Sequence, residues 1–252
     1  MQSTLEELQQ QDAVRVVIIK GAGEKAFCTG HDLNKMIGQD HQELRELFDK
    51  CSRVMTTLTQ KLPQPVIAEV NGIATATGCQ LVASCDLAVA SDTATFAVSG
   101  INVGLFCSTP AVALSRNLPR KHAMHMLLTG DFISAETAQR HGLVNQVVPA
   151  AELEQSTMQL ARNIASKSPL SIRLGKDMFY KQHVLDDVEE AYAFAAERMA
   201  CNMDASDARE GIHAFLKKTK TRMERKVNPP IIAMFGAVTI PTRLGQPSQQ
   251  AF

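Results

Sequence analysis

The chain has 252 residues, of which 45% are hydrophobic and 21% charged, and its 26 Lys and Arg residues balance 26 Asp and Glu residues. This length allows one large α/β domain with a buried core, and the neutral balance argues against the basic surface that nucleic-acid phosphates attract. No apolar run approaches the roughly 18 to 20 residues that a membrane-spanning helix needs. We therefore expect a globular protein with no nucleic-acid partner and no membrane span.

The first half of the chain predicts alternating strands and helices. A helix over residues 1–11 precedes a strand over 14–20, where VRVVIIK is the unbroken β-branched run typical of a strand covered on both faces. Apolar residues then recur at spacings of three and four over 44–62, which predicts an amphipathic helix ended by two prolines. Buried strands follow over 66–70 and 87–90. This order predicts a largely parallel sheet with helical crossovers.

The second half is predicted to be mainly helical. Helical patterns cover residues 120–129 and 134–141, a short strand covers 143–148, and long helices start near residues 153, 170 and 188. We divide the chain into an α/β core over residues 1–115, a helical region over 116–217 and a tail over 218–252.

The tail differs from the rest in composition. It holds four of the ten prolines and six basic residues against one acidic residue. Because prolines interrupt a regular helix, we expect a peripheral, Pro-rich basic tail. Its apolar stretch over 231–240 is interpreted as a loosely attached strand rather than a docking segment.

The six cysteines, at positions 28, 51, 79, 85, 107 and 201, form no CxxC pair. Neither a metal site nor a disulfide scaffold is expected, and the thiols should be free in a reducing compartment. No transit peptide is visible in this chain, although the immediate start in helix-like sequence suggests that the natural start lies upstream.

Two glycine-containing turns, each after a predicted strand, are the main candidates for a binding site. AFCTGHDL covers residues 26–33 and NGIATATGCQL covers 71–81. Small residues before a helix leave backbone N–H groups open to a ligand, so two such turns side by side would offer two donors to one oxygen. The plainer alternative is a pair of ordinary strand-to-helix turns. Neither turn has the pattern of a dinucleotide or P-loop site.

Three blocks of the sequence resemble one known family. AFCTGHDL is similar to AFxAGxDL, VIAEVNGIATATGCQLVASCDLAVAS to PVIAAVNGxAxGGGxELALACDxxxA, and LLTGDFISAETAQRHGLVNQVV to LTGxxIxAxxAxxxGLVxxVV. These blocks belong to the enoyl-CoA hydratase/isomerase (crotonase) superfamily, and the resemblance runs over residues 1 to about 217. It implies an α/β fold, a spiral of βββα-type turns with a helical C-terminal trimerisation region. It also implies an acyl-CoA thioester as ligand or substrate, with no other cofactor and no metal.

The resemblance also implies how the thioester is held. The backbone N–H groups of His31 and Thr77 correspond to the two donors of the family's oxyanion hole, where they would stabilise negative charge on the thioester oxygen by several kcal/mol. We expect the substrate to be bound by residues around these donors, namely Gly30, Asp32, Gly78 and Cys107.

The acid–base groups of the hydratases are missing from the matching positions. Gln80 and Gly100 stand where the family has two glutamates, and neither residue can exchange a proton at neutral pH. We therefore expect an acyl-CoA-binding protein that lacks hydratase chemistry. The alternative is an enzyme that forms an enolate with an unidentified base. A structural protein without a ligand is disfavoured because Gly30 and Gly78 are kept.

Other side chains are assigned structural roles. The ring of His31 is expected to point away and serve its turn, with catalysis as the minority interpretation, and residues 107–109 are expected to line the acyl pocket without forming a nucleophilic dyad. Asp32 is predicted to cap a helix. Structural positions are also expected for Cys79, Cys85 and Asp86.

Within the family, GHDL, ATGCQLVASCD and NVGLFCSTP are similar to a group usually assigned to mitochondria. The resemblance thus implies a mitochondrial protein of fatty-acid and lipid metabolism that forms a homotrimer or hexamer. The resemblance further implies an N-terminal truncation, because family members have an opening hairpin before the position that corresponds to residue 1. Without it, we expect the strand over 14–20 to expose an unpaired edge that the Pro-rich tail cannot cover.

Overall fold

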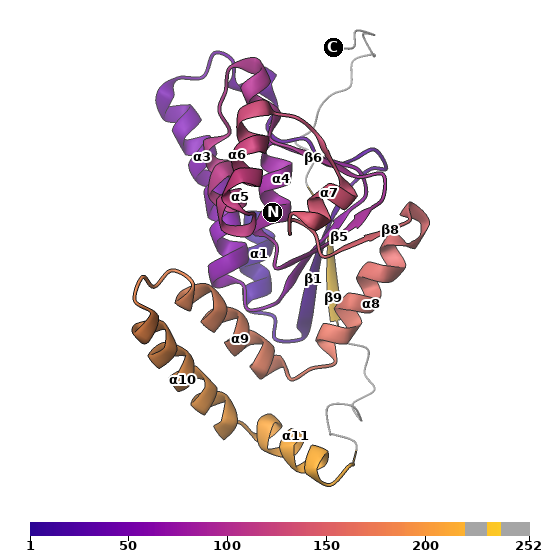
Figure 1. The fold of residues 1–252 in the computed structure, drawn as a ribbon, viewed down its shortest axis with the longest axis vertical. Helices are drawn as coiled ribbons and strands as arrows, with labels where there is room; N and C mark the ends of the chain where they lie inside the picture. The colour runs from indigo at the N-terminus through magenta and orange to yellow at the C-terminus, as the bar shows by residue number, and fades with distance from the viewer. Residues whose placement is uncertain (220–230, 238–252) are drawn as a thin grey trace.

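The computed structural model describes residues 1–219 and 231–237, which form two sheets surrounded by helices (Figure 1). The larger sheet contains, in spatial order, β8 (Gln146–Val148), β5 (Leu87–Ser91), β3 (Val66–Val70), β1 (Val14–Gly21) and β9 (Ile231–Ala237). The smaller sheet contains β2 (Ala26–Cys28), β4 (Ile73–Thr75), β6 (Thr95–Ala97) and β7 (Ile133–Ser134).

The chain passes repeatedly from the larger sheet to the smaller one. Strands β1, β3 and β5 lie in the larger sheet, and each is followed by its short partner β2, β4 or β6 in the smaller sheet. Neighbouring strands pair in parallel, except for the antiparallel pair of β6 and β7. Helices follow these strand pairs, so the chain advances as a spiral. The predicted α/β spiral with a helical C-terminal region is confirmed.

The first half contains α1 (Gln2–Gln9), α2 (Leu33–Met36), α3 (His41–Thr56), a π-helical turn (Thr57–Lys61), α4 (Thr77–Ser84), a 3-10 turn (Ser99–Val103) and α5 (Ser108–Asn117). The second half contains α6 (Arg120–Thr129), α7 (Ala135–Arg140), a 3-10 turn (Ala150–Glu152), α8 (Leu153–Ala165), α9 (Pro169–Gln182), α10 (Val188–Asp204) and α11 (Ser206–Leu216). The helix predicted over 44–62 is α3 with the π-helical turn. It starts earlier because Asp40 forms a capping box with Glu43.

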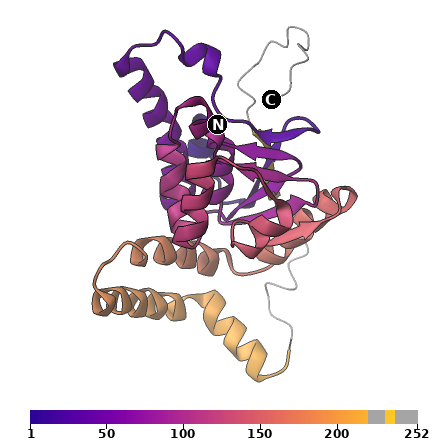
Figure 2. The ribbon, with the colours of Figure 1, turned by 45° about the horizontal axis from the view of Figure 1, so that its top comes forward.

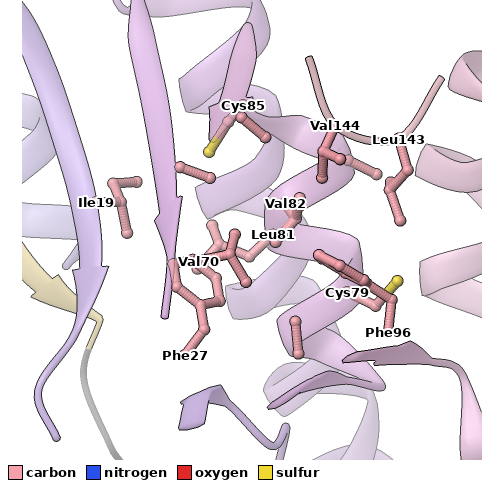
Figure 3. Close-up of a cluster of buried hydrophobic side chains, with 14 of the residues drawn as sticks. Ile19, Phe27, Val70, Cys79, Leu81, Val82, Cys85, Phe96, Leu143 and Val144 are labelled. Carbon is pink, nitrogen blue, oxygen red and sulfur yellow. The ribbon is translucent and has the colours of Figure 1, made fainter. Parts of the chain in front are cut away.

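The larger sheet is covered on both faces, as the β-branched run of β1 predicts. Val17 and Ile19 face the main core, whereas Val16 and Ile18 face a second cluster that includes residues of α8. Figure 3 shows the main core around α4, with Leu81 and Val82 among the labelled side chains. Because seven of the eight residues of α4 are buried, this helix is a rigid support for the backbone and side-chain groups of its first residue, Thr77.

The edge of β1 is not open. Strand β9 pairs with it in parallel, from Val14 opposite Ile231 to Gly21 opposite Ala237. The expectation of an unpaired edge over 14–20 was therefore wrong, whereas the strand predicted within 231–240 is confirmed as β9, which pairs at the edge of the larger sheet. The prolines at 229, 230 and 241 lie outside this strand and do not interrupt its hydrogen bonding. Most of the predicted basic tail, residues 220–230 and 238–252, lies outside the described residues.

Helices α9, α10 and α11 form an arm that extends from the body (Figure 2). The base of the arm is fixed by Asp86, whose carboxylate accepts hydrogen bonds from Lys176 Nζ at 2.7 Å and Tyr180 Oη at 2.8 Å. The same carboxylate accepts the Val66 N–H at 2.7 Å, which ties α9 to β3. Asp86 thus has the structural role that was predicted for it. Among the residues that the structure describes, no helix is long and apolar enough to cross a membrane.

Candidate functional site

The two glycine-containing turns meet because the strands before them are paired. Cys28 at the end of β2 lies opposite Ala74 of β4, so the chain leaves both strands at the same place. Gly30 has φ +93°, and a Cβ atom built on it would lie 3.0 Å from Ala76 Cβ and 3.4 Å from Thr77 N. The turns are therefore in direct contact, as the side-by-side arrangement requires.

Gly78 sets how closely α4 approaches β2. A Cβ atom at this position would lie only 1.9 Å from the carbonyl oxygen of Cys28, which no side chain can accommodate without a backbone shift. Gly78 is itself buried. Its role is thus close packing between the helix and the strand rather than contact with a bound molecule.

A cavity of about 400 Å³ opens beside the two turns. Four of the predicted site residues line it: His31, Thr77, Gly100 and Cys107. Most of its other walls are apolar, with Leu33, Met36 and Phe48 from α2 and α3, and Val103, Leu105 and Phe106 from the loop before α5. Asp32 has a different task, since its carboxylate accepts the Asn34 N–H at 3.0 Å and caps α2 as predicted.

The backbone N–H groups of His31 and Thr77 are open donors. Neither N–H makes a hydrogen bond within the described part of the chain, although both residues line the cavity. Unpaired backbone donors usually find a partner in water or a ligand. One oxygen atom placed between the two turns could accept from both.

The side chain of His31 does not point away from the site. His31 lines the cavity, and its ring nitrogen Nδ1 lies 2.9 Å from the hydroxyl oxygen of Thr77, which lines the same cavity. The edge of the ring contacts Phe48, with 5.8 Å between the ring centroids. Burial lowers the pKa of His31 below its usual 6.5, so the imidazole is neutral at pH 7. The sequence expectation for this ring was therefore wrong, because it considered only the histidine's own turn.

The two positions that the resemblance assigns to glutamates lie in different cavities. Gln80 is 3% exposed and lines a second cavity of about 450 Å³, where its Oε1 has no hydrogen-bond partner among the described residues. Gly100 lines the first cavity, but a Cβ atom there would lie 2.5 Å from the carbonyl oxygen of Leu105. A side chain at position 100 would therefore require movement of the loop before α5.

The cysteines near the first cavity are protonated thiols. Burial raises the pKa of Cys28 and of Cys107, and it raises the pKa of Cys51 to about 11. Because the thiolate is the reactive form of cysteine, none of these residues is a nucleophile at neutral pH. Cys107 thus lines the pocket, as the sequence indicated.

Sequence reasoning missed the hydroxyl group of Thr77. It treated this residue only as a backbone donor, but its side chain also lines the cavity and bonds to His31. The available signal was a threonine at a position where the family block has glycine. Its partner could not be identified from the sequence, because the two residues are 46 positions apart.

Comparison with known proteins relates this arrangement to one family. A family model described as enoyl-CoA hydratase/isomerase matches residues 1–226. The mouse enoyl-CoA hydratase domain-containing protein 3, named as mitochondrial, is 50% identical over 219 residues, which cover 86% of this chain and 71% of the mouse protein. The crotonyl-CoA hydratase of Syntrophomonas wolfei is 34% identical over 218 residues, covering 85% of this chain and 82% of that protein.

Solved structures agree with the sequence matches. An enoyl-CoA hydratase from Mycobacterium smegmatis superposes with a TM-score of 0.86 at 48% identity, covering 88% of this chain and 86% of the other. Human enoyl-coenzyme A hydratase domain-containing protein 3 gives a TM-score of 0.80 at 49% identity, with coverages of 87% and 89%. The predicted resemblance is therefore confirmed, including the similarity to the group usually assigned to mitochondria. This chain belongs to the enoyl-CoA hydratase/isomerase family.

Proposed function

We propose that this protein binds an acyl-CoA and holds the thioester carbonyl with the backbone N–H groups of His31 and Thr77. One observation carries the proposal: these two unpartnered donors lie on touching turns beside a single, mostly apolar cavity. Two fixed donors stabilise a carbonyl oxygen most when negative charge develops on it, and apolar walls suit an acyl chain.

Calorimetric titration with crotonyl-CoA, acetyl-CoA and free CoA tests this proposal. Both thioesters should bind more tightly than free CoA. Gly30→Ala should weaken thioester binding, because the added methyl group presses on Ala76 and glycine alone adopts φ +93° easily. Gly142→Ala is the matched control, since Gly142 also has a positive φ of +85°, but a Cβ atom there would lie near Asn117 O and not against the Thr77 turn. Equal affinity for thioesters and free CoA would contradict the proposed site.

We further infer that enoyl-CoA hydration is negligible. Each general acid or base typically contributes about 10²- to 10⁴-fold to a rate, and glutamine and glycine replace both groups. Loss of enoyl absorbance from crotonyl-CoA should therefore stay close to the uncatalysed rate. A partial gain in a Gln80→Glu, Gly100→Glu double variant would support the inference, although the second change must displace Leu105. Hydration by the unaltered protein at an ordinary enzymatic rate would refute it.

A mitochondrial role in fatty-acid or lipid metabolism is part of the proposal. Its support is the word mitochondrial in the names of the mouse, rat and human relatives, together with an apolar cavity beside two carbonyl-binding donors. Fractionation of cells that express the full-length protein with a C-terminal tag tests the compartment. Recovery outside the mitochondria would remove this part of the proposal.

Assembly into a trimer, or a hexamer of two trimers, is also proposed. Helix α10 has no buried residue, and apolar side chains of α10 and α11 such as Tyr192, Met199 and Phe215 are at least 72% exposed. Exposed apolar surface of this kind usually marks an interface. Sedimentation should give a trimer or larger, and Met199→Glu should weaken the assembly. A folded monomer at micromolar concentration would contradict this proposal.

A further inference from the structure

We propose that the Thr77 hydroxyl and the His31 imidazole form a nucleophile–base pair that hydrolyses the bound acyl-CoA thioester. The inference rests on the proposed function, because it needs the thioester carbonyl at the N–H groups of the same two residues. The observation behind it is the 2.9 Å contact between Thr77 Oγ1 and His31 Nδ1, which belong to two residues that line the cavity. That distance is within the hydrogen-bond reach expected of a nucleophile and its base.

The backbone presents Thr77 in the manner of a nucleophile. Thr77 is the first residue of α4 and follows β4 through Ala76, which has φ +51° and ψ −119°. A non-glycine residue in this conformation stores strain, and such residues cluster at functional sites. A sharp, strained turn from a strand into a helix is also how α/β-hydrolases expose a nucleophilic serine. The buried helix behind Thr77 keeps this turn in place.

Proton transfer between the two side chains has a defined direction. The neutral imidazole of His31 can accept the hydroxyl proton on Nδ1 when its own proton is on Nε2. The other group close to the hydroxyl is the thiol of Cys51, whose pKa of about 11 leaves it protonated. The imidazole is therefore the acceptor for the Thr77 proton. The carboxylate of Asp32, the next residue in the chain after His31, accepts the Asn34 N–H and caps α2.

The position of the open donors fits attack by Thr77. In chymotrypsin-like serine proteases the N–H of the nucleophilic serine itself contributes to the oxyanion hole, together with a second N–H. Here the N–H of Thr77 is one donor and the N–H of His31 is the other, so both residues supply a backbone donor as well as a reactive side chain. The negative charge that forms on the thioester oxygen would lie between them.

The reaction balances with water as the only co-reactant. Thr77 Oγ1 forms a bond to the carbonyl carbon while its proton moves to His31 Nδ1, and the C–S bond then breaks. The proton on Nδ1 passes to the departing thiolate, which leaves CoA with a free thiol and an acyl ester on Thr77. Water, deprotonated by His31, next attacks this ester. The carboxylic acid leaves, the proton returns to Thr77 Oγ1, and the protein is regenerated.

Thiol release from butyryl-CoA and octanoyl-CoA measures the activity directly. Thr77→Val keeps the backbone N–H and the side-chain shape but removes the hydroxyl, so we expect at least a hundredfold lower rate with thioester affinity retained. Thr77→Ser should keep measurable activity. Thr129→Val is the matched control, because it removes a threonine hydroxyl from α6, where the hydroxyl donates to the carbonyl oxygen of His125 and does not line the cavity, and it should change the rate less than threefold.

Two further readouts separate a catalytic pair from a structural hydrogen bond. The unaltered protein should show a rate that rises with pH and levels off above the lowered pKa of His31, and His31→Gln should lose this dependence. Mass spectrometry of protein quenched during turnover should find an acyl group on the peptide that contains Thr77. A Thr77→Val rate equal to that of the unaltered protein would overturn the inference.

The inference and the proposed function fail in different ways. A ketone analogue of acyl-CoA, with a methylene group between sulfur and carbonyl, binds without being cleaved. If it binds but no thioester releases CoA above background, the hydrolytic pair is refuted and the binding site stands. Exchange of the acyl α-protons without CoA release would likewise refute hydrolysis. If the analogue and the thioesters do not bind, the proposed function fails and the inference with it.

Discussion

Replacing Lys176 by alanine is expected to loosen the base of the helical arm. Lys176 is 8% exposed in its side chain, and its Nζ donates to Asp86 at 2.7 Å and to the carbonyl oxygen of Gln64 at 2.9 Å. The change would leave the Asp86 carboxylate, which is 16% exposed, without its counter-charge.

The expected loss of free energy of unfolding depends on the hydrogen bonds that Asp86 retains in the variant. Removing one partner of a buried ion pair typically costs about 3–5 kcal/mol, because the other charge stays buried and uncompensated. Tyr180 and the Val66 N–H still donate to Asp86 in the variant, so we expect the lower end of this range, about 3 kcal/mol. Lys181→Ala on the same helix should cost less than about 1 kcal/mol, since its ion pair with Asp177 involves a lysine side chain that is 55% exposed.

Urea denaturation at a fixed protein concentration measures both free energies of unfolding, and fixing the concentration removes the effect of assembly on apparent stability. Lys176→Ala, Asp86→Ala and the double variant form a cycle that isolates the pair. The double variant should be more stable than the sum of the single losses predicts, because neither charge is then left alone. If Lys176→Ala costs no more than Lys181→Ala, the reasoning about this anchor is wrong.

Three further predictions concern packing and pH. Gly78→Ala should displace β2, lowering the midpoint of urea unfolding and thioester affinity together, because its Cβ would meet Cys28 O at 1.9 Å. Burial and the neighbouring His122, whose ring stacks on that of His141, lower the pKa of His141 in the folded protein. As the pH drops below 6.5, the unfolded chain takes up this proton before the folded protein does, so the stability should fall. His141→Gln should reduce that fall. Burial raises the pKa of Glu69 above 4.5, so as the pH rises from 4.5 the unfolded chain loses this proton before the folded protein does, and stability should fall. Glu69→Gln should therefore raise the midpoint of urea unfolding at pH 7 but not at pH 4.

The larger sheet was largely predictable and the smaller one was not. The runs in β1 and β3 are mostly apolar and rich in β-branched residues, so they indicate buried strands whatever their partners are. Strands β2, β4 and β6 have only three residues each and no periodicity that could separate them from turns. Strand β9 was predicted as a strand, but its pairing with β1 was not. Its pairing depends on where β1 leaves an open edge, which is a property of the fold and not of the local sequence.

The candidate site, like the fold, was predictable from the sequence only in part. The backbone donors at His31 and Thr77 could be predicted, because glycine-containing turns after buried strands belong to a recognisable pattern. The hydrogen bond between their side chains could not, because it depends on the pairing of β2 with β4. The placement of Gln80 in a separate cavity also depends on how α3, α5 and α9 pack around α4. Contacts between helices and strands that are far apart in the sequence therefore could not be predicted from the sequence.

The pairing of β9 with β1 has a consequence for synthesis on the ribosome. Residues 14–21 emerge early, whereas their partner at 231–237 emerges only after the other described strands and the helical arm have been made. During that interval the β1 edge carries unpaired backbone groups and can pair with another nascent chain. Among the described strands, β9 is paired on one side only, whereas β3 is paired on both, so amide hydrogens of 231–237 should exchange sooner than those of β3. A chain cut after Lys217 would retain that vulnerable edge throughout its lifetime.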